Sequence, residues 1–262
     1  MLMKSIFMSK LPKEYQFIDL SDYGRPIAKI IAKSLKSTSF TPVDVTIAFI
    51  ISGLIGVYCI FEGYYFAAAF FIIFKSILDA ADGELARMKE TPSYTGRFLD
   101  SVSDIILNFI IFLTIWKLTE IHIGYVLLAF FGVQLQGTLY NYYYVILRNR
   151  FNGDTTSRVF EDSTPIALPG EKQRNVNILF FLYKAFYGIF DKTIYLLDRN
   201  ASTGENLPNW LMSCISTFGL GFQLLIISIL LVLELKEIIV PFFIFYSGLI
   251  FVYIAIRKIF FN

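Results

Sequence analysis

The stretch Asp79–Asp104, which reads DAADGELARMKETPSYTGRFLDSVSD, decides how the whole chain is interpreted. It carries two pairs of aspartates, Asp79 with Asp82 and Asp100 with Asp104, among segments that are strongly apolar. An acidic residue at the centre of a membrane helix costs about 2.5–3.5 kcal/mol. Four acids in this setting need a compensating partner, and divalent metal ions would provide one.

Helical spacing brings these carboxylates together. Residues three or four positions apart share one face of a helix, so each pair would project from one side of its own helix. Two such helices facing each other would converge all four carboxylates on one point. A ligand set made only of carboxylates suits Mg²⁺, Mn²⁺ or Ca²⁺ and argues against zinc. The sequence therefore predicts a site for a hard divalent cation.

Small and basic residues accompany the acids. Gly83, Ala86 and Gly96 leave room for a ligand to approach the backbone. Arg87 offers a planar set of donors that suits phosphate. Metal ions, an arginine and glycines around an anion are typical of phosphoryl transfer. The alternative is a solvated loop with ordinary surface aspartates, which the helical spacing beside apolar runs disfavours.

The composition is that of an integral membrane protein. Of the 262 residues, 56% are hydrophobic and 17% are charged, and the net charge of +2 gives no indication of nucleic-acid binding. His122 is the only histidine and is far from the acids in sequence, while Cys59 and Cys214 both lie in apolar runs. These features argue against a Ser-His-Asp triad, a Cys-His pair, a disulfide framework and a zinc site.

Six apolar segments are long enough to cross a bilayer as helices. They lie at about residues 43–60, 63–87, 97–117, 122–147, 208–233 and 238–256. The first acidic pair lies in the last part of the second segment, and the second pair lies near the start of the third. The prediction is an all-α integral membrane protein in which residues 43–262 form one six-helix domain. Glycine pairs such as Gly219 and Gly221 would permit close packing, although glycine is common in membrane helices.

Charge placement predicts the orientation in the membrane. With the N-terminus in the cytosol, every lysine and arginine except Lys117 and Lys236 falls on the cytosolic side. This asymmetry agrees with the positive-inside tendency. Both termini and the acidic site would then be cytosolic, where soluble nucleotides and metal ions are available.

Residues 1–42 are predicted to be a cytosolic lead-in that contains an amphipathic helix. Between Tyr23 and Lys36, apolar and basic residues form two opposite stripes at helical spacing. The stripes consist of Ile27, Ile30, Ile31 and Leu35, and of Arg25, Lys29, Lys33 and Lys36. Such a helix lies on an anionic membrane surface. The alternative is an amphipathic helix packed on protein.

Residues 148–206 are predicted to form a cytosolic loop and a second interfacial helix. The polar stretch 148–175 is either a substrate-facing loop or a disordered linker. Residues 176–197 are long enough to span a membrane but carry three charged residues, Lys184, Asp191 and Lys192. We therefore expect this segment to lie on the membrane surface.

The motif within Asp79–Asp104 resembles the signature of the CDP-alcohol phosphotransferases, also called CDP-alcohol phosphatidyltransferases. That signature is Asp-x2-Asp-Gly-x2-Ala-Arg-x8-Gly-x3-Asp-x3-Asp, and the chain carries it without gap or substitution. The matching residues are Asp79, Asp82, Gly83, Ala86, Arg87, Gly96, Asp100 and Asp104. A looser likeness, in the number and placement of membrane helices, covers roughly residues 40–261.

The resemblance implies an activity. Enzymes of this family move a phosphate-linked alcohol from a CDP-alcohol to an acceptor hydroxyl and release CMP, with two divalent ions (here Mg²⁺ or Mn²⁺), usually as homodimers. Carried over by position, the four aspartates would ligate the metals, and Asp104 would also be the general base. The expected substrate-binding residues are Gly83 and Arg87 at the nucleotide and diphosphate, Ser93 at the donor, Gly96 beside the cytidine, and Ala86.

The chain departs from the family pattern in three places. Pro42–Thr46 keeps the proline and threonine that often begin the first helix but lacks the asparagine between them. Thr95 stands where phenylalanine is frequent. Ser101 stands where choline- and ethanolamine-transferring members carry histidine, which weighs against that branch.

The substrates remain open at this point. A CDP-diacylglycerol donor is favoured, in phospholipid biosynthesis, because a site at the membrane surface leaves acyl tails in the lipid. A soluble donor such as CDP-inositol is the alternative. The acceptor is expected to be a small alcohol or alcohol phosphate. Arg148, Arg150 and Arg158 are candidates to bind a phosphorylated acceptor, or are simply positive-inside anchors.

A cation transporter is the rival from another functional class, because acids inside membrane segments also mark ion pathways. A transporter predicts acids near the middle of the bilayer and on several helices. Here the acids lie at helix ends, with Arg87 and glycines at fixed offsets from them. This placement favours the enzyme.

Overall fold

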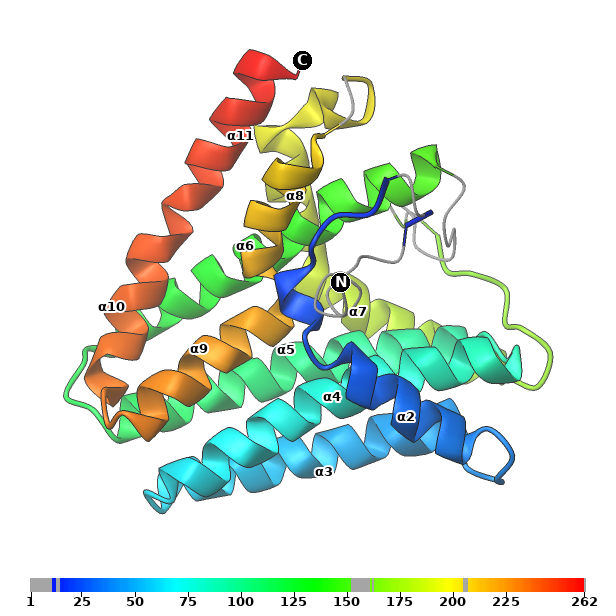
Figure 1. The fold of residues 1–262 in the computed structure, drawn as a ribbon, viewed down its shortest axis with the longest axis horizontal. Helices are drawn as coiled ribbons and strands as arrows, with labels where there is room; N and C mark the ends of the chain where they lie inside the picture. Colours follow the sequence, from blue (N-terminus) through cyan, green and yellow to red (C-terminus); the bar gives the residue numbers. More distant parts are fainter. Residues whose placement is uncertain (1–10, 13–14, 152–160, 162, 205–206, 262) are drawn as a thin grey trace.

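The computed structural model describes residues 11–12, 15–151, 161, 163–204 and 207–261. These residues form helices joined by turns and loops, without a β-sheet, which confirms the predicted all-α fold (Figure 1). The α-helices are α2 (Arg25–Leu35), α3 (Pro42–Phe61), α4 (Tyr65–Lys89), α5 (Tyr94–Lys117), α6 (Ile123–Arg150), α7 (Gln173–Leu197), α8 (Asn209–Ile215), α9 (Leu220–Val232), α10 (Lys236–Ser247) and α11 (Leu249–Phe260). Short 3₁₀ helices are η2 (Leu20–Asp22), η3 (Arg199–Ser202) and η4 (Ser216–Phe218).

Several helices are long and apolar enough to cross a membrane. In the described part of the chain these are α3, α5, α6 and the stretch Lys236–Phe260 formed by α10 and α11. The stretch from α8 to α9, bent by 53°, would be a fifth span if it is counted as one. Helices α4 and α7 have 25 residues each but are not among these candidate spans. The chain is thus a membrane protein, and the count of six spans stays a prediction.

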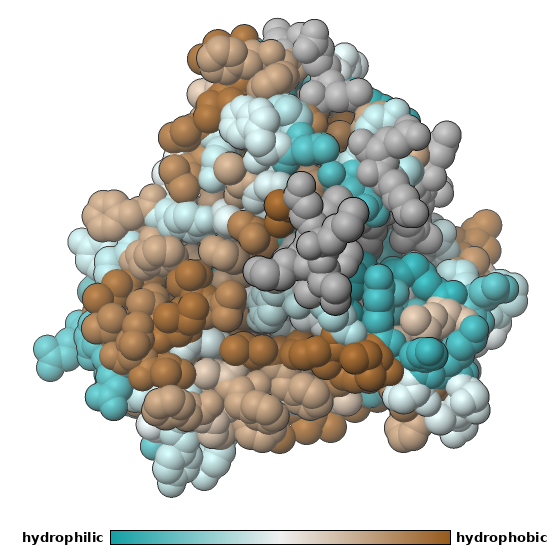
Figure 2. Space-filling model, viewed as in Figure 1, coloured by the Kyte–Doolittle hydropathy of each residue, from teal (hydrophilic) through white to brown (hydrophobic). Residues whose placement is uncertain are grey.

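Helices α3, α4 and α5 lie side by side and form the layer that carries the acidic motif (Figure 1). Buried apolar residues such as Ile72, Phe112 and Phe243 hold this layer against α6, α9 and α10. Gly56 allows α3 to approach α4 closely, because a Cβ there would lie 3.0 Å from Ile72 Cγ1. Large apolar side chains such as Phe70 remain exposed, and Figure 2 shows apolar side chains spread over α3, α4, α9 and α10.

Helix α2 forms within the stretch predicted to be an amphipathic helix, but Arg25 of the predicted basic stripe is buried. Ala28 and Ala32 are fully buried in a cluster with residues of α4. Ile27 and Ile30, by contrast, are 50% and 69% exposed. Ala28 and Ala32 therefore contact the protein together with the partly buried Ile31 and Leu35, while Ile27 and Ile30 face outward, as a helix on a membrane surface requires. The location of α2 on a membrane stays a prediction.

The segment before α2 is attached to helices that come much later in the chain. The Leu20 amide donates to Ser216 Oγ (2.9 Å), and the Tyr140 hydroxyl donates to Asp19 Oδ2 (2.6 Å). Ser21 fits against Gly219 and Gly221 of the bend before α9. The close packing predicted for this glycine pair is therefore present, and its partner is the N-terminal segment.

Replacing Gly221 with alanine should detach this segment. A Cβ at position 221 would lie 2.0 Å from the Ser21 carbonyl oxygen, a backbone atom that cannot simply rotate away. We expect Gly221→Ala to lower the free energy of unfolding by about 1–3 kcal/mol, measured as a lower Tm in detergent micelles. Gly188→Ala is the matched control, because the nearest atom would lie 3.8 Å away. Equal Tm values for the two variants would contradict this account of the packing.

Candidate active site

The turn between α4 and α5 brings the two acidic pairs together. Glu90 ends α4 in the left-handed conformation with φ 53°, and the Ser93 hydroxyl accepts a hydrogen bond from the Gly96 amide (2.8 Å) at the start of α5. The left-handed Glu90 ends α4 and the capping residue Ser93 begins α5, so the connection between the two helices is short. The last turns of α4 and the first turns of α5 therefore lie next to each other, as the sequence predicts.

Three of the four aspartates form a group that could hold a metal ion. Oxygen atoms of Asp79, Asp82 and Asp100 all lie within 4.8 Å of one another. Asp100 Oδ1 is buried and has no hydrogen-bond partner among the described residues. An unpaired buried carboxylate oxygen is costly, and a divalent cation would satisfy it. The residues present therefore fit a hard cation with oxygen ligands.

The fourth aspartate has a different partner. Asp104 forms a buried ion pair with Lys75 of α4, one helical turn before Asp79. Lys75 is only 2% exposed, and its Nζ lies 5.0 Å from the centre of the Phe49 ring. Removing one member of such a pair would leave a buried charge without compensation. Lys75 was not among the predicted site residues, although its spacing of four from Asp79 places both on the same face of α4.

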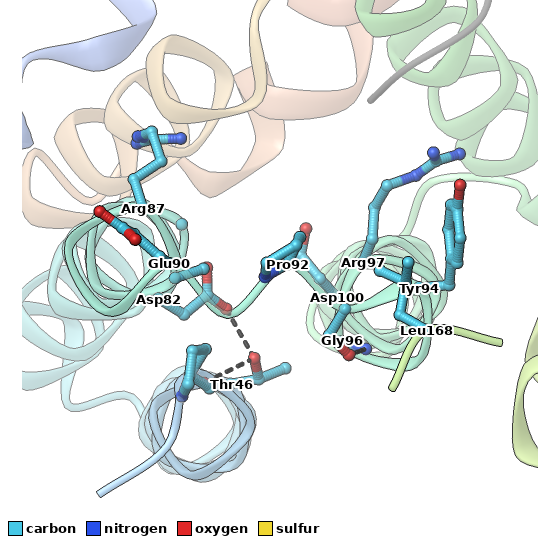
Figure 3. A pocket seen from close by; sticks show the side chains of 14 residues that line it. Thr46, Asp82, Arg87, Glu90, Pro92, Tyr94, Gly96, Arg97, Asp100 and Leu168 are labelled. Atoms are coloured by element: carbon cyan, nitrogen blue, oxygen red, sulfur yellow. Dashed lines mark hydrogen bonds between the residues drawn. The ribbon is translucent and has the colours of Figure 1, made fainter. Parts of the chain in front are cut away.

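A cavity of about 590 Å³ opens beside this three-carboxylate group. All five expected substrate-binding residues line it, namely Gly83, Ala86, Arg87, Ser93 and Gly96. Figure 3 shows Asp82 and Asp100 approaching the same space from α4 and α5. Thr46 Oγ1 donates to Asp82 Oδ2 (2.6 Å), so the threonine kept at the start of α3 positions a predicted metal ligand.

An ion-pair chain orients Arg87 at the edge of this cavity. Arg87 Nη2 and Arg25 Nη1 each lie 2.9 Å from Glu84 Oε1. The Arg87 side chain is 41% exposed, so its guanidinium can be reached by an anion. Glu84 lies in the motif stretch but was not among the predicted site residues. One of its two partners, Arg25, is 59 residues away, and local spacing does not reveal such a contact.

The segment before α7 reaches the same cavity. Glu171 Oε1 accepts from the Ser93 hydroxyl (2.8 Å) and from the Thr95 amide (2.7 Å), and Glu171 Oε2 accepts from the Leu168 amide (3.0 Å). Leu168 lines the cavity. These contacts support the substrate-facing interpretation for the later part of 148–175. Residues 152–160 and 162 lie outside the described residues.

A second cavity, of about 340 Å³, lies on the other side of the acids. It is lined by Asp104 and by polar residues of α6, and it shares Asp100 and Arg97 with the first cavity. The two cavities thus meet at Asp100, one of the three clustered aspartates. An arrangement of this kind can hold two substrates with their reacting atoms close together.

The arginines considered for the acceptor lie elsewhere. Arg150 Nη2 donates to the Ser202 and Gly204 carbonyl oxygens (2.9 and 3.0 Å). The Arg148 guanidinium lies over the Tyr144 ring at 5.5 Å from its centre. Neither of these two arginines lines either cavity. Arg158 lies outside the described residues.

Part of the chain matches a known protein family. Residues 40–161 match the CDP-alcohol phosphatidyltransferase family, while no curated protein matches the chain. The match runs from just before α3 to just beyond α6 and includes the complete motif. The chain therefore contains a CDP-alcohol phosphatidyltransferase domain at residues 40–161, and the resemblance of the motif is confirmed. This family implies transfer from a CDP-alcohol.

Loss of one clustered carboxylate should weaken metal binding. We expect Asp79→Asn, Asp82→Asn and Asp100→Asn each to raise the Kd for Mn²⁺ on the order of tenfold or more, because fewer charged oxygens remain. Electron paramagnetic resonance of free Mn²⁺ measures this without any substrate. Glu90→Gln is the matched control, since Glu90 lines the same cavity outside the group of three. Unchanged Mn²⁺ affinity in all three variants would exclude a metal site here.

The contact made by Glu171 should depend on pH. Burial raises the pKa of Glu171, but the hydrogen bonds from Thr95, Ser93 and Leu168 outweigh burial and hold it below its ordinary value of 4.5. The stabilisation is therefore present above pH 4.5 and is lost as the pH falls through the lower pKa of the folded state.

Hydrogen exchange of the Thr95 and Leu168 amides, corrected for intrinsic rates, should show protection at neutral pH that disappears in this acidic range. Glu171→Gln should show weak protection at both pH values. Protection that does not change with pH in the unmodified protein would contradict the role of the carboxylate.

Proposed function

We propose that the protein transfers a phosphatidyl group from CDP-diacylglycerol to an acceptor alcohol and releases CMP, in a metal-dependent reaction of phospholipid biosynthesis. The observation that carries this proposal is the position of the three-carboxylate group beside a cavity lined by all five expected donor-binding residues. The proposal includes a cytosolic active site and a homodimer, as the family resemblance and the charge distribution suggest.

The residues have distinct roles in this reaction. Arg87 and the backbone at Gly83 would bind the diphosphate and nucleotide in the first cavity. Metal ions held by Asp79, Asp82, Asp100 and Asp104 would offset the charge of the diphosphate and of the departing CMP. The donor thereby lies on one side of the acids, and the second cavity remains for the acceptor.

The chemical step is a substitution at phosphorus. The acceptor oxygen forms a bond to the phosphorus that carries diacylglycerol, the bond from this phosphorus to the bridging oxygen breaks, and that oxygen leaves with CMP. The hydroxyl proton passes to Asp104, which lines the second cavity. A carboxylate is a weak base towards an alcohol, so it takes the proton late in the step. Lys75 holds the Asp104 carboxylate in position through their ion pair.

The position of the first cavity supports a lipid donor. The first cavity lies at the ends of apolar helices α3 and α5, so a lipid donor could place its nucleotide there while its acyl chains stay in the membrane. A soluble CDP-alcohol such as CDP-inositol would use the same residues. A cation transporter is less well supported, because the acids adjoin a cavity of nucleotide size with Arg87 at its edge.

CMP release tests this proposal directly. The purified protein with Mg²⁺ or Mn²⁺ and CDP-diacylglycerol should release CMP when a suitable alcohol is added. Release with CDP-inositol alone would assign a soluble donor. Metal-ion flux into liposomes without CMP release from any CDP-alcohol would support the transporter instead.

Asp104→Asn should separate turnover from donor binding. Because the base is removed while the side chain keeps its shape, we expect the rate of CMP release to fall by about 10²–10⁴-fold. CMP binding, measured by equilibrium dialysis, should stay close to that of the unmodified protein because the nucleotide residues lie in the first cavity. Near-normal turnover would show that another group accepts the proton.

A further inference from the structure

One face of α6 forms a polar wall of the second cavity. Gln134, Thr138 and Asn141 follow one another at spacings of four and three, so they share a face of the helix. Gln134 and Thr138 are only 6% and 7% exposed. Polar side chains buried in an apolar helix bundle need hydrogen-bond partners.

Two of these side chains have none among the described residues. Gln134 Nε2 and Thr138 Oγ1 are both buried and make no hydrogen bond there. Leaving such a buried polar group unpaired is destabilising. Two of them, one helical turn apart and lining the same cavity, indicate that a ligand supplies the partners.

Two neighbouring side-chain amides, those of Gln136 and Gln223, do have hydrogen-bond partners within the protein. Gln136 Nε2 donates to Ser247 Oγ (2.9 Å), and Gln223 Nε2 donates to Gln136 Oε1 (3.1 Å) and to the Val133 carbonyl oxygen (3.1 Å). Gln136 does not line the second cavity. Gln134 and Thr138 therefore differ from their neighbours Gln136 and Tyr140, which both have hydrogen-bond partners within the protein.

The charges of the second cavity disfavour an anionic ligand. Arg97 is the sole cationic residue in its described lining, and it forms an ion pair with Glu161. The acids that line the cavity are Asp100, Asp104, Glu161 and Asp191. A phosphate is normally held by arginine or lysine donors, and here Arg97 is already paired with Glu161, while Asp191 adds a further carboxylate besides the proposed metal ligands Asp100 and Asp104.

The unpaired groups also disfavour a simple cation. The amide nitrogen of Gln134 donates hydrogen bonds and needs an acceptor, which an ammonium group does not have. A hydroxyl group both donates and accepts, so it can pair with the Gln134 amide and with the Thr138 hydroxyl. Several hydroxyl groups on one small molecule would match several polar residues on the wall.

We infer that the second cavity selects an uncharged polyhydroxy alcohol as the acceptor, in preference to its phosphate ester. The inference rests on the proposed function, since it names the class of acceptor for that reaction. One hydroxyl of the polyol lies at Asp104 and gives up its proton, while others bind the α6 wall. Gln134 and Thr138 are then specificity-determining residues for the acceptor.

Matched acceptor pairs test this inference. The full chain in detergent micelles, with Mn²⁺ and CDP-diacylglycerol, is given inositol or inositol 1-phosphate, glycerol or glycerol 3-phosphate, and ethanolamine, and CMP release is measured. We expect kcat/KM for a free polyol to exceed that for its phosphate by about tenfold or more, equivalent to about 1.4 kcal/mol. A preference for either phosphate ester or for ethanolamine would overturn the inference.

Variants of the wall test the residues. Gln134→Leu and Thr138→Val should each raise KM for the polyol by about 5- to 20-fold through loss of one hydrogen bond, with KM for the donor unchanged. Thr114→Val is the matched control, because its buried hydroxyl donates to the Ile110 carbonyl oxygen (2.8 Å) and it lines neither cavity. An acceptor KM that is the same in all three variants would overturn the assignment.

Direct binding separates failure of this inference from failure of the proposed function. If no acceptor drives CMP release, the proposed reaction fails for this donor, and equilibrium dialysis of radiolabelled inositol with Mn²⁺ decides the inference. Inositol binding that Gln134→Leu weakens and Thr114→Val preserves would support the polyol site. Absence of inositol binding would overturn it.

Discussion

Burial of several carboxylates between helices α4 and α5 is the constraint on which the rest of the structure depends. Each acid needs compensation, and different parts of the chain provide it. Asp82 accepts from Thr46 of α3, Asp104 pairs with Lys75, and Glu84 pairs with Arg87 and with Arg25 of α2. One oxygen of Asp100 is left without a partner among the described residues, at the point where the two cavities meet. The carboxylate oxygen that lacks a partner therefore lies where the proposed reaction is expected to take place.

This arrangement divides the site by function. Residues of the motif face the larger cavity, whereas residues of α6, α7 and α9 line much of the smaller one. The family match covers helices α3 to α6, whereas α7 and α9 lie after the matched residues. In the proposed reaction, the wall facing the donor is built from the shared motif, and part of the wall facing the acceptor comes from segments outside the match. Such a division allows the acceptor to differ between proteins that keep the same phosphoryl chemistry.

The sequence predicted the features that depend on local spacing. The all-α fold, the apolar helices and the convergence of Asp79, Asp82 and Asp100 all follow from helical periodicity. Contacts between distant segments were not predictable in this way, since Glu171 meets Ser93 across 78 residues. The unpaired state of Gln134 was equally hidden, because spacing does not show which face of α6 meets a cavity. The packing of the N-terminal segment against the 53° bend before α9 is likewise a contact that no local pattern reveals.

The position of that N-terminal segment has a consequence for biosynthesis. The amide of Leu20 bonds to a residue 196 positions later, and Asp19 bonds to one 121 positions later. A ribosome adds about 5–20 residues per second, so the segment emerges on the order of ten seconds or more before its last partner is made. Throughout that interval the polar groups of Asp19 and Leu20 must remain in water or bind a chaperone. Leu20 thus reaches its final contact only after Ser216 has been synthesised.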